Sequence, residues 1–213
     1  MSNYARAENE YNAGEFLKFV EAENKKPGNE HTRYELIDGQ IYMLSAPNTN
    51  HMGLSRFIYD IFSKYMADKQ CGVYYAPYDV FLIKLPSRSK SKKVNKNKCR
   101  DVVQPDLFVL CDKDKLKLDG IHGAPELVIE IVSRSSVKLD YLSKLNAYMN
   151  LGVKEYWIVD PLKKRIIIYQ AIKDGKADDL LLFNYTFDDT VESKIFPALS
   201  VDFRRFEWVQ NEE

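Results

Sequence analysis

Apolar residues at helical spacing mark three helices along the chain. A short amphipathic helix is predicted over residues 14–23, where apolar side chains recur on one face. A longer amphipathic helix is predicted to begin with a cap among residues 48–50 and to end near Gln70. A third is predicted over residues 138–151, because Gly152 then supplies the left-handed residue that commonly follows a helix.

Strand-like runs occupy much of the remaining chain. Two runs within residues 34–44 flank Asp38-Gly39, which predicts a two-residue hairpin because both turn positions need positive φ. Two more runs lie within residues 72–85 and are broken at Pro77. The other predicted strands are residues 102–110, 127–133, 155–160, 165–170 and most of 173–200, the last with a second Asp-Gly turn at Asp174-Gly175.

The order of these elements predicts an α+β fold, a mixed sheet flanked by helices with added hairpins near both ends of the chain. A chain of 213 residues can form one good core, so a single domain over residues 1–213 is expected. Residues 1–13 are polar and are expected to be disordered. Residues 87–98 hold six basic residues and almost no apolar ones, which predicts a mobile basic loop. The segment 111–125 is polar and is expected to connect two strands.

Composition narrows the function only slightly. Lys plus Arg and Asp plus Glu both number 31, so net charge gives no argument for nucleic acid, although a local basic surface remains open. Cys71, Cys99 and Cys111 have no metal-like spacing and are expected to be reduced thiols. The chain has no apolar run of transmembrane length and no signal-type start, so a cytoplasmic protein without membrane contact is expected.

Two acidic residues interrupt apolar runs and are the first candidates for chemistry. Asp106 follows Pro105 at the start of one run, and Glu130 stands inside a strand that is apolar on both faces. A carboxylate in a buried strand is costly unless it is paired or bound to a metal. If the two strands are neighbours, both carboxylates come within reach of one Mg²⁺, which prefers oxygen ligands.

The third helix adds a candidate cation. Asp140, Lys144 and Tyr148 fall at i, i+4 and i+8 and therefore share one side. Lys144 could steady a nucleophile and the negative charge that develops on a phosphate. Ordinary structural roles stay open: Asp106 as a turn or cap residue, Glu130 as a buried ion pair, and Asp140 with Lys144 as a surface salt bridge.

Taken together, several segments resemble the Uma-type restriction endonuclease family of the PD-(D/E)xK nuclease superfamily. The resemblance covers about residues 14–170. Its matching pieces are residues 34–39 (YELIDG), His51, 103–106 (VQPD), 124–133 (APELVIEIVS), 152–161 (GVKEYWIVDP), Asp140, Lys144 and Tyr148.

The resemblance implies a core of helix, three strands, helix and strand, with Asp106 and Glu130 as the two metal-binding acids. The superfamily's lysine stands two residues after the second acid, where this chain has Val132. In Uma-type sequences a lysine on the following helix takes that place, and here it is Lys144. Glu35 and His51 match further positions: Glu35 as an added carboxylate, and His51 as a phosphate contact or helix cap.

The function implied by the resemblance is that of an endonuclease dependent on Mg²⁺, with Mn²⁺ able to substitute. Its expected substrate is nucleic acid, with DNA first, and residues 87–98 fit either a phosphate-contacting arm or a solvated connector. Val132 favours the alternative, a nuclease-fold protein that binds nucleic acid or a protein partner without cleaving. Many nucleases that cut both strands act as pairs, so a homodimer is one expected assembly, and the C-terminal strands could also mediate self-association.

Overall fold

Two six-stranded sheets organise the computed structural model, which describes residues 10–83, 95–172 and 180–209. The central sheet is mixed: β9 and β10 run parallel, and its other neighbours are antiparallel. Its strands, in spatial order, are β12 (Leu180–Thr186), β11 (Arg165–Ala171), β10 (Glu155–Asp160), β9 (Leu127–Ile131), β6 (Leu107–Leu110) and β3 (Gly72–Tyr75). A parallel pair needs a crossover, and the helical residues 139–151 provide it.

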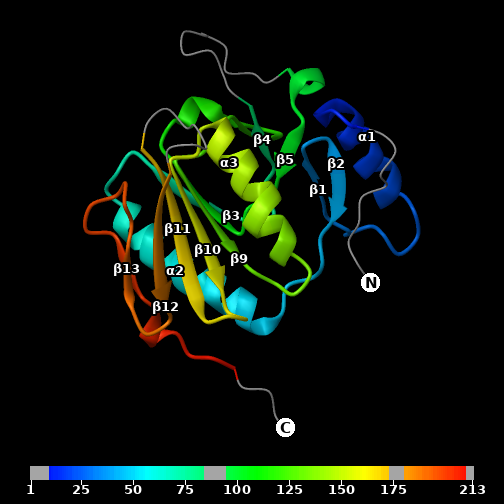
Figure 1. Ribbon diagram of the computed structural model, residues 1–213. Helices are drawn as coiled ribbons and strands as arrows, with labels where there is room; N and C mark the ends of the chain where they lie inside the picture. The colour runs from blue at the N-terminus through cyan, green and yellow to red at the C-terminus, as the bar shows by residue number, and fades with distance from the viewer. Residues whose placement is uncertain (1–9, 84–94, 173–179, 210–213) are drawn as a thin grey trace.

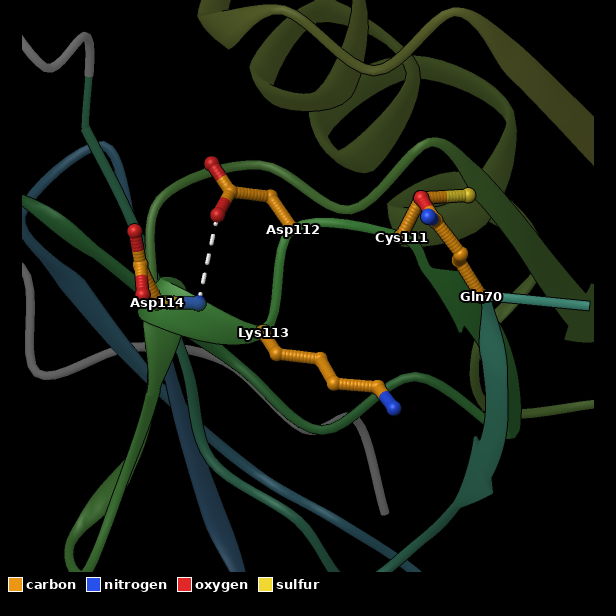
Figure 2. A pocket seen from close by; sticks show the side chains of 5 residues that line it. All are labelled: Gln70, Cys111, Asp112, Lys113 and Asp114. Atoms are coloured by element: carbon orange, nitrogen blue, oxygen red, sulfur yellow. Dashed lines mark hydrogen bonds between the residues drawn. The ribbon is translucent and has the colours of Figure 1, made fainter.

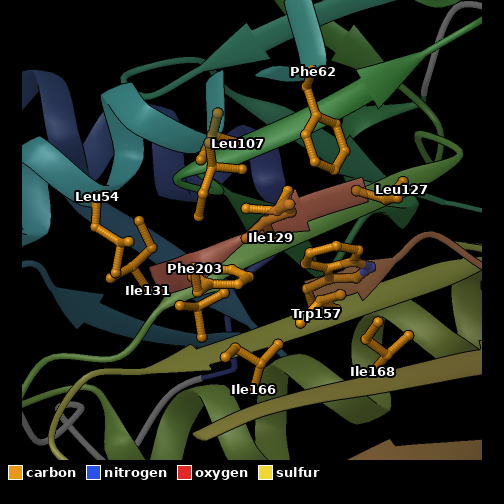
Figure 3. Packing of buried hydrophobic residues seen from close by; sticks show 14 of the residues in the cluster. Leu54, Phe62, Leu107, Leu127, Ile129, Ile131, Trp157, Ile166, Ile168 and Phe203 are labelled. Carbon is orange, nitrogen blue, oxygen red and sulfur yellow. The ribbon is translucent and has the colours of Figure 1, made fainter. Parts of the chain in front are cut away.

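Two helical segments cover the two faces of the central sheet (Figure 1). On one face, α2 (Thr49–Met66) packs its buried side chains against the sheet. That cluster contains Leu54, Phe62, Ile129, Trp157 and Phe203 (Figure 3). On the other face lie a π-helix, Leu139–Lys144, and α3 (Leu145–Leu151), which follows it directly. Both faces of the strands are therefore buried, which explains their continuous apolar runs.

The second sheet lies beside the first and is formed by shorter strands. In spatial order they are β2 (Gln40–Met43), β1 (Tyr34–Ile37), β5 (Asp101–Val103), β4 (Val80–Leu82), β8 (Gly120–His122) and β7 (Leu116–Lys117). Helix α1 (Ala13–Asn24) packs on it through buried Ala13 and Phe16. A small pair, β13 (Thr190–Glu192) with β14 (Ser200–Asp202), and three 3₁₀ turns, Lys96–Lys98, Lys113–Lys115 and Phe203–Arg205, complete the described elements.

Most of the predicted elements are confirmed, as is the α+β class. Asn48 caps α2 by accepting the His51 N–H at 2.9 Å. The first hairpin turns at Asp38 and Gly39, with φ of 48° and 73°. Gly152 ends α3 with φ of 106°. These positions follow local rules, so the sequence alone could identify them.

The single strand predicted over residues 102–110 is wrong. It is two strands, because β5 pairs in the second sheet and β6 in the central sheet. Pro105 lies between them; it has no N–H to give to a ladder, and it restricts Gln104. The polar segment 111–125 also differs from the prediction, since it contains β7 and β8, and β8 pairs with β4.

The segments expected to be disordered or mobile lie partly outside the described residues, at residues 1–9 and 87–94. The predicted turn at Asp174-Gly175 lies wholly outside them. Where the chain is described, residues 10–13 depart from the first expectation, whereas residues 95–98 are compatible with a loop. Asn12 caps α1 and Ala13 is fully buried, while Lys96–Lys98 form a 3₁₀ turn. Over the described ranges, no helix combines the length and apolarity needed to cross a bilayer.

The expectation of three reduced cysteines is wrong for two of them. Cys71 and Cys111 form a disulfide across the ends of β3 and β6, where the pairing of Gly72 with Leu110 brings their neighbours together. Only the third, Cys99, is free, and it is buried. The spacing in sequence gave no sign of this pairing because it depends on strand register.

Candidate active site

The strands β6 and β9 bring the two predicted acids together. Leu107 lies opposite Ile129 in this antiparallel pair, so Asp106 and Glu130 occupy the next position on each strand. Asp106 Oδ2 accepts the Ile131 N–H at 2.7 Å. The break at Pro105 matters here, because it sets Asp106 at the very start of β6.

Lys144 reaches the same place from the crossover helix. Its Nζ lies 2.9 Å from Glu130 Oε1, 3.1 Å from Glu35 Oε2 and 3.6 Å from Asp140 Oδ1. Its side chain is only 5% exposed. Asp140 and Lys144 both belong to the π-helical segment, and such segments often occur at functional sites. A surface salt bridge between them is therefore excluded, whereas a buried ion pair for Glu130 describes its contact with Lys144 correctly.

Glu35 enters the site from the second sheet. It is fully buried on β1, and its Oε1 accepts the Gln104 N–H at 2.7 Å. This bond ties β1 to the segment that carries Asp106. The site therefore lies where the two sheets meet.

His51 stands at the first turn of α2 and faces Asp106. Its Nε2 lies 3.2 Å from Asp106 Oδ2, and its Nδ1 is buried without a hydrogen-bond partner. Burial lowers the pKa of His51, but the Asp106 carboxylate outweighs this and leaves the pKa above its ordinary value. The structure thus brings together all five predicted residues, Glu35, His51, Asp106, Glu130 and Lys144.

Tyr148 is a contact that the sequence-based list of site residues missed. Its hydroxyl donates to Glu130 Oε1 at 2.6 Å, so Glu130 Oε1 is shared by Tyr148 and Lys144. The i, i+4, i+8 spacing from Asp140 was the available signal. Ser133, three residues after Glu130, bonds with the hydroxyls of Ser135 and Ser136 and not with Glu130.

The site holds more carboxyl groups than Lys144 can pair, and burial raises the pKa of two of them. Burial raises the pKa of Glu130 well above its usual value and that of Asp140 to about 7. Burial lowers the pKa of Lys144, but the carboxylates of Glu130, Glu35 and Asp140 hold it well above its ordinary value. Glu35 Oε2 and Asp140 Oδ1 are buried and accept no hydrogen bond, although each lies within ion-pair distance of Lys144 Nζ.

Two further observations describe the site and its surroundings. Across the part of the chain that the structure describes, no three His, Cys, Asp or Glu side chains are grouped so that they could hold a metal ion. A shallow pocket of about 350 Å³ lies at the opposite end of β3 and β6, beside the disulfide and lined by Gln70, Cys111, Asp112, Lys113 and Asp114 (Figure 2). The acidic cluster is therefore separate from this pocket.

Comparison with known proteins agrees with the geometry. A family model described as "Uma2: Putative restriction endonuclease" matches residues 16–204. The chain belongs to this family. "Uncharacterized protein slr1290" of Synechocystis sp. strain PCC 6803 is 25% identical over 181 residues, which cover 84% of this chain and 83% of that protein.

A solved structure shows the same fold. It is the crystal structure of a putative nuclease belonging to DUF820 from Anabaena variabilis ATCC 29413. The match has a TM-score of 0.61 and 16% identity, over 92% of this chain and 97% of the other. The predicted membership of the Uma-type family and the predicted restriction-endonuclease-like core are thereby confirmed.

Proposed function

We propose that this member of the Uma2 family is an endonuclease that hydrolyses phosphodiester bonds in DNA with Mg²⁺ as its cofactor. The observation that carries the proposal is the meeting of Asp106, Glu130 and Lys144 at the end of two central strands, with Nζ 2.9 Å from Glu130 Oε1. Acids and a lysine converging from separate elements are typical of sites that activate water.

The residue types suit a divalent cation, although the described carboxylates are not grouped closely enough to hold one as they stand, with Lys144 Nζ lying between Glu35 and Glu130. The oxygens of Glu35 and Asp140 that accept no hydrogen bond, and the several carboxyl groups around one lysine, favour a hard cation with oxygen ligands. Asp106 and Glu130 would hold the ion, with Glu35 as an added ligand, and Mn²⁺ would substitute. When bound, the ion lowers the pKa of a water and takes up negative charge from the phosphate.

The chain's own residues supply the rest of the chemistry. Lys144 Nζ orients the attacking water and stabilises the charge that develops on the phosphate oxygens. Tyr148 fixes Glu130 through its 2.6 Å hydrogen bond. His51 is held in place by Asp106, whose Oδ2 lies 3.2 Å from Nε2, and stands beside a carboxylate proposed to hold the ion.

Cleavage of supercoiled plasmid DNA in Mg²⁺ or Mn²⁺ tests the proposal. Glu130→Gln and Lys144→Ala should each lower the rate on the order of 10²–10³-fold, as expected when a group that stabilises the transition state is removed. Glu21→Gln and Lys25→Ala are matched controls, because that pair is exposed on α1. Equal cleavage by the site variants and the wild type would reject this assignment.

A second function is favoured by Val132. With no lysine at that position and with Glu130 Oε1 already shared by Lys144 and Tyr148, the chain could bind nucleic acid or a protein partner without cutting. Titration calorimetry separates the two. Salt-sensitive DNA binding with no detectable Mg²⁺ binding would support the second function.

A further inference from the structure

An exposed tyrosine lies one residue from the acidic site. Tyr75 ends β3, where it pairs with Leu107 of β6. The next N–H, that of Ala76, donates to the Asp106 carbonyl at 3.2 Å. Tyr75 is nevertheless 56% exposed, although an aromatic side chain gains most when it is buried.

A second tyrosine packs against the ring of the first. Tyr59 of α2 meets the Tyr75 ring edge-on, with centroids 5.0 Å apart and planes at 80°. Tyr59 lies two helical turns beyond His51 on α2, and it packs against the cluster on that face of the sheet. The two rings thus belong to α2 and β3. Helix α2 also carries His51, and β3 lies beside Asp106.

Arg56 borders these rings and carries little free charge. Its Nε bonds both oxygens of Asp60, at 2.9 and 2.8 Å. The Asp60 carboxylate raises the pKa of Arg56 most, and the Tyr59 and Tyr75 phenols add to this, so all three side chains are within electrostatic range. Arg56 and Asp60 together add no net charge to this surface, so the exposed Tyr75 ring is the feature that it offers to a ligand.

If the chain is a nuclease, the aromatic ligand expected beside the Tyr75 ring is a nucleobase of its substrate. We infer that Tyr75, supported by Tyr59, stacks on a base of the substrate strand close to the scissile phosphate. Base–aromatic stacking needs an accessible π face, which a paired duplex does not offer. The chain therefore prefers substrates with an unpaired base at this position. The inference rests on the proposed function, whose site supplies the phosphate.

Fluorescence anisotropy of a labelled single-stranded DNA of about twelve nucleotides tests this, with Ca²⁺ in place of Mg²⁺. Tyr75→Leu keeps apolar bulk but removes the ring, and it should weaken binding ~10-fold, because the stacking contribution of the ring is lost. Tyr75→Phe, the matched control, should bind within about twofold of wild type, because it keeps the ring. Tyr59→Leu should weaken binding less than Tyr75→Leu, and thermal melting checks that each variant is folded.

An abasic scan of the same DNA locates the base. At one position, removing the base should weaken the wild type as much as Tyr75→Leu does, and the two losses should not add. Equal binding by Tyr75→Leu and Tyr75→Phe, or full additivity at every position, would overturn the inference while leaving cleavage untouched. Binding that depends on Tyr75 without any metal-dependent cleavage would instead reject the proposed function and keep the stacking site.

Discussion

Lys144 is buried among three carboxylates, those of Glu35, Glu130 and Asp140. Burying such a group is costly, and a buried ion pair seldom adds more stability than an apolar core of the same size. Two buried carboxylate oxygens that accept no hydrogen bond raise the cost further. The arrangement is therefore poor as a stabilising device, which agrees with the proposal that these residues are kept to hold a cation.

The hydrogen bond from Tyr148 to Glu130 can be removed without changing the packing. Tyr148→Phe should lower the metal-dependent cleavage rate, because Glu130 loses one of the two donors that fix it. It should also cost about 1.5–3 kcal/mol, the usual size for a bond to a charged group. Tyr156→Phe is the control, since its equally buried hydroxyl donates to the Asp140 carbonyl instead. If both variants cut at the same rate, Tyr148 has no positioning role.

Among elements, those governed by local rules were predictable and those governed by long-range pairing were not. The helices, their caps and the first hairpin follow from spacing and turn chemistry. By contrast, β7 and β8 have two and three residues, too few for any periodicity to be read. The division of residues 102–110 between two sheets depends on partners far away in the chain.

The residues of the candidate site also fall into those that the sequence could reveal and those that it could not. Asp106 and Glu130 could be found because an acid in an apolar run stands out. The contact of Glu35 with Lys144 could not be derived from spacing, since Glu35 is buried only when β1 joins β5 in the second sheet. The π-helical turn that points Asp140 and Lys144 inward also has no marker in the apolar pattern.

The disulfide between β3 and β6 gives a prediction at this scale. The cysteines are 40 residues apart, so closing that loop should stabilise the fold by about 4 kcal/mol. Reduction should lower the urea midpoint of the wild type, and the double variant Cys71→Ser, Cys111→Ser should be insensitive to reductant. Cys99 should not react with alkylating agents in the folded protein, whether the disulfide is intact or reduced, because burial raises its pKa to about 11. A midpoint unaffected by reduction would contradict the bridge.

Across the whole molecule, the C-terminal segment completes the core on the α2 face. Leu199, Val201 and Phe203 are buried there with residues of the central sheet. The carboxylate of Glu155, at the start of β10, is fully buried and holds this segment in place. Its Oε2 accepts three bonds, from the Ser193 hydroxyl and the N–H groups of Lys194 and Ile195. In the sequence this glutamate looked like an ordinary first residue of a strand.

Removing this anchor should loosen the C-terminal segment before it affects the acidic site. Glu155→Ala leaves several buried donors without an acceptor and should destabilise the fold by at least about 3 kcal/mol. Glu155→Gln keeps the volume and one acceptor oxygen, so its loss should be about half as large. Hydrogen exchange at the Lys194 and Ile195 amides should accelerate in both variants, whereas Glu192→Ala, which alters an exposed residue of β13, should leave them unchanged. Unaltered exchange at these two amides in Glu155→Ala would show that burial of Val201 and Phe203, rather than the carboxylate, holds the segment in place.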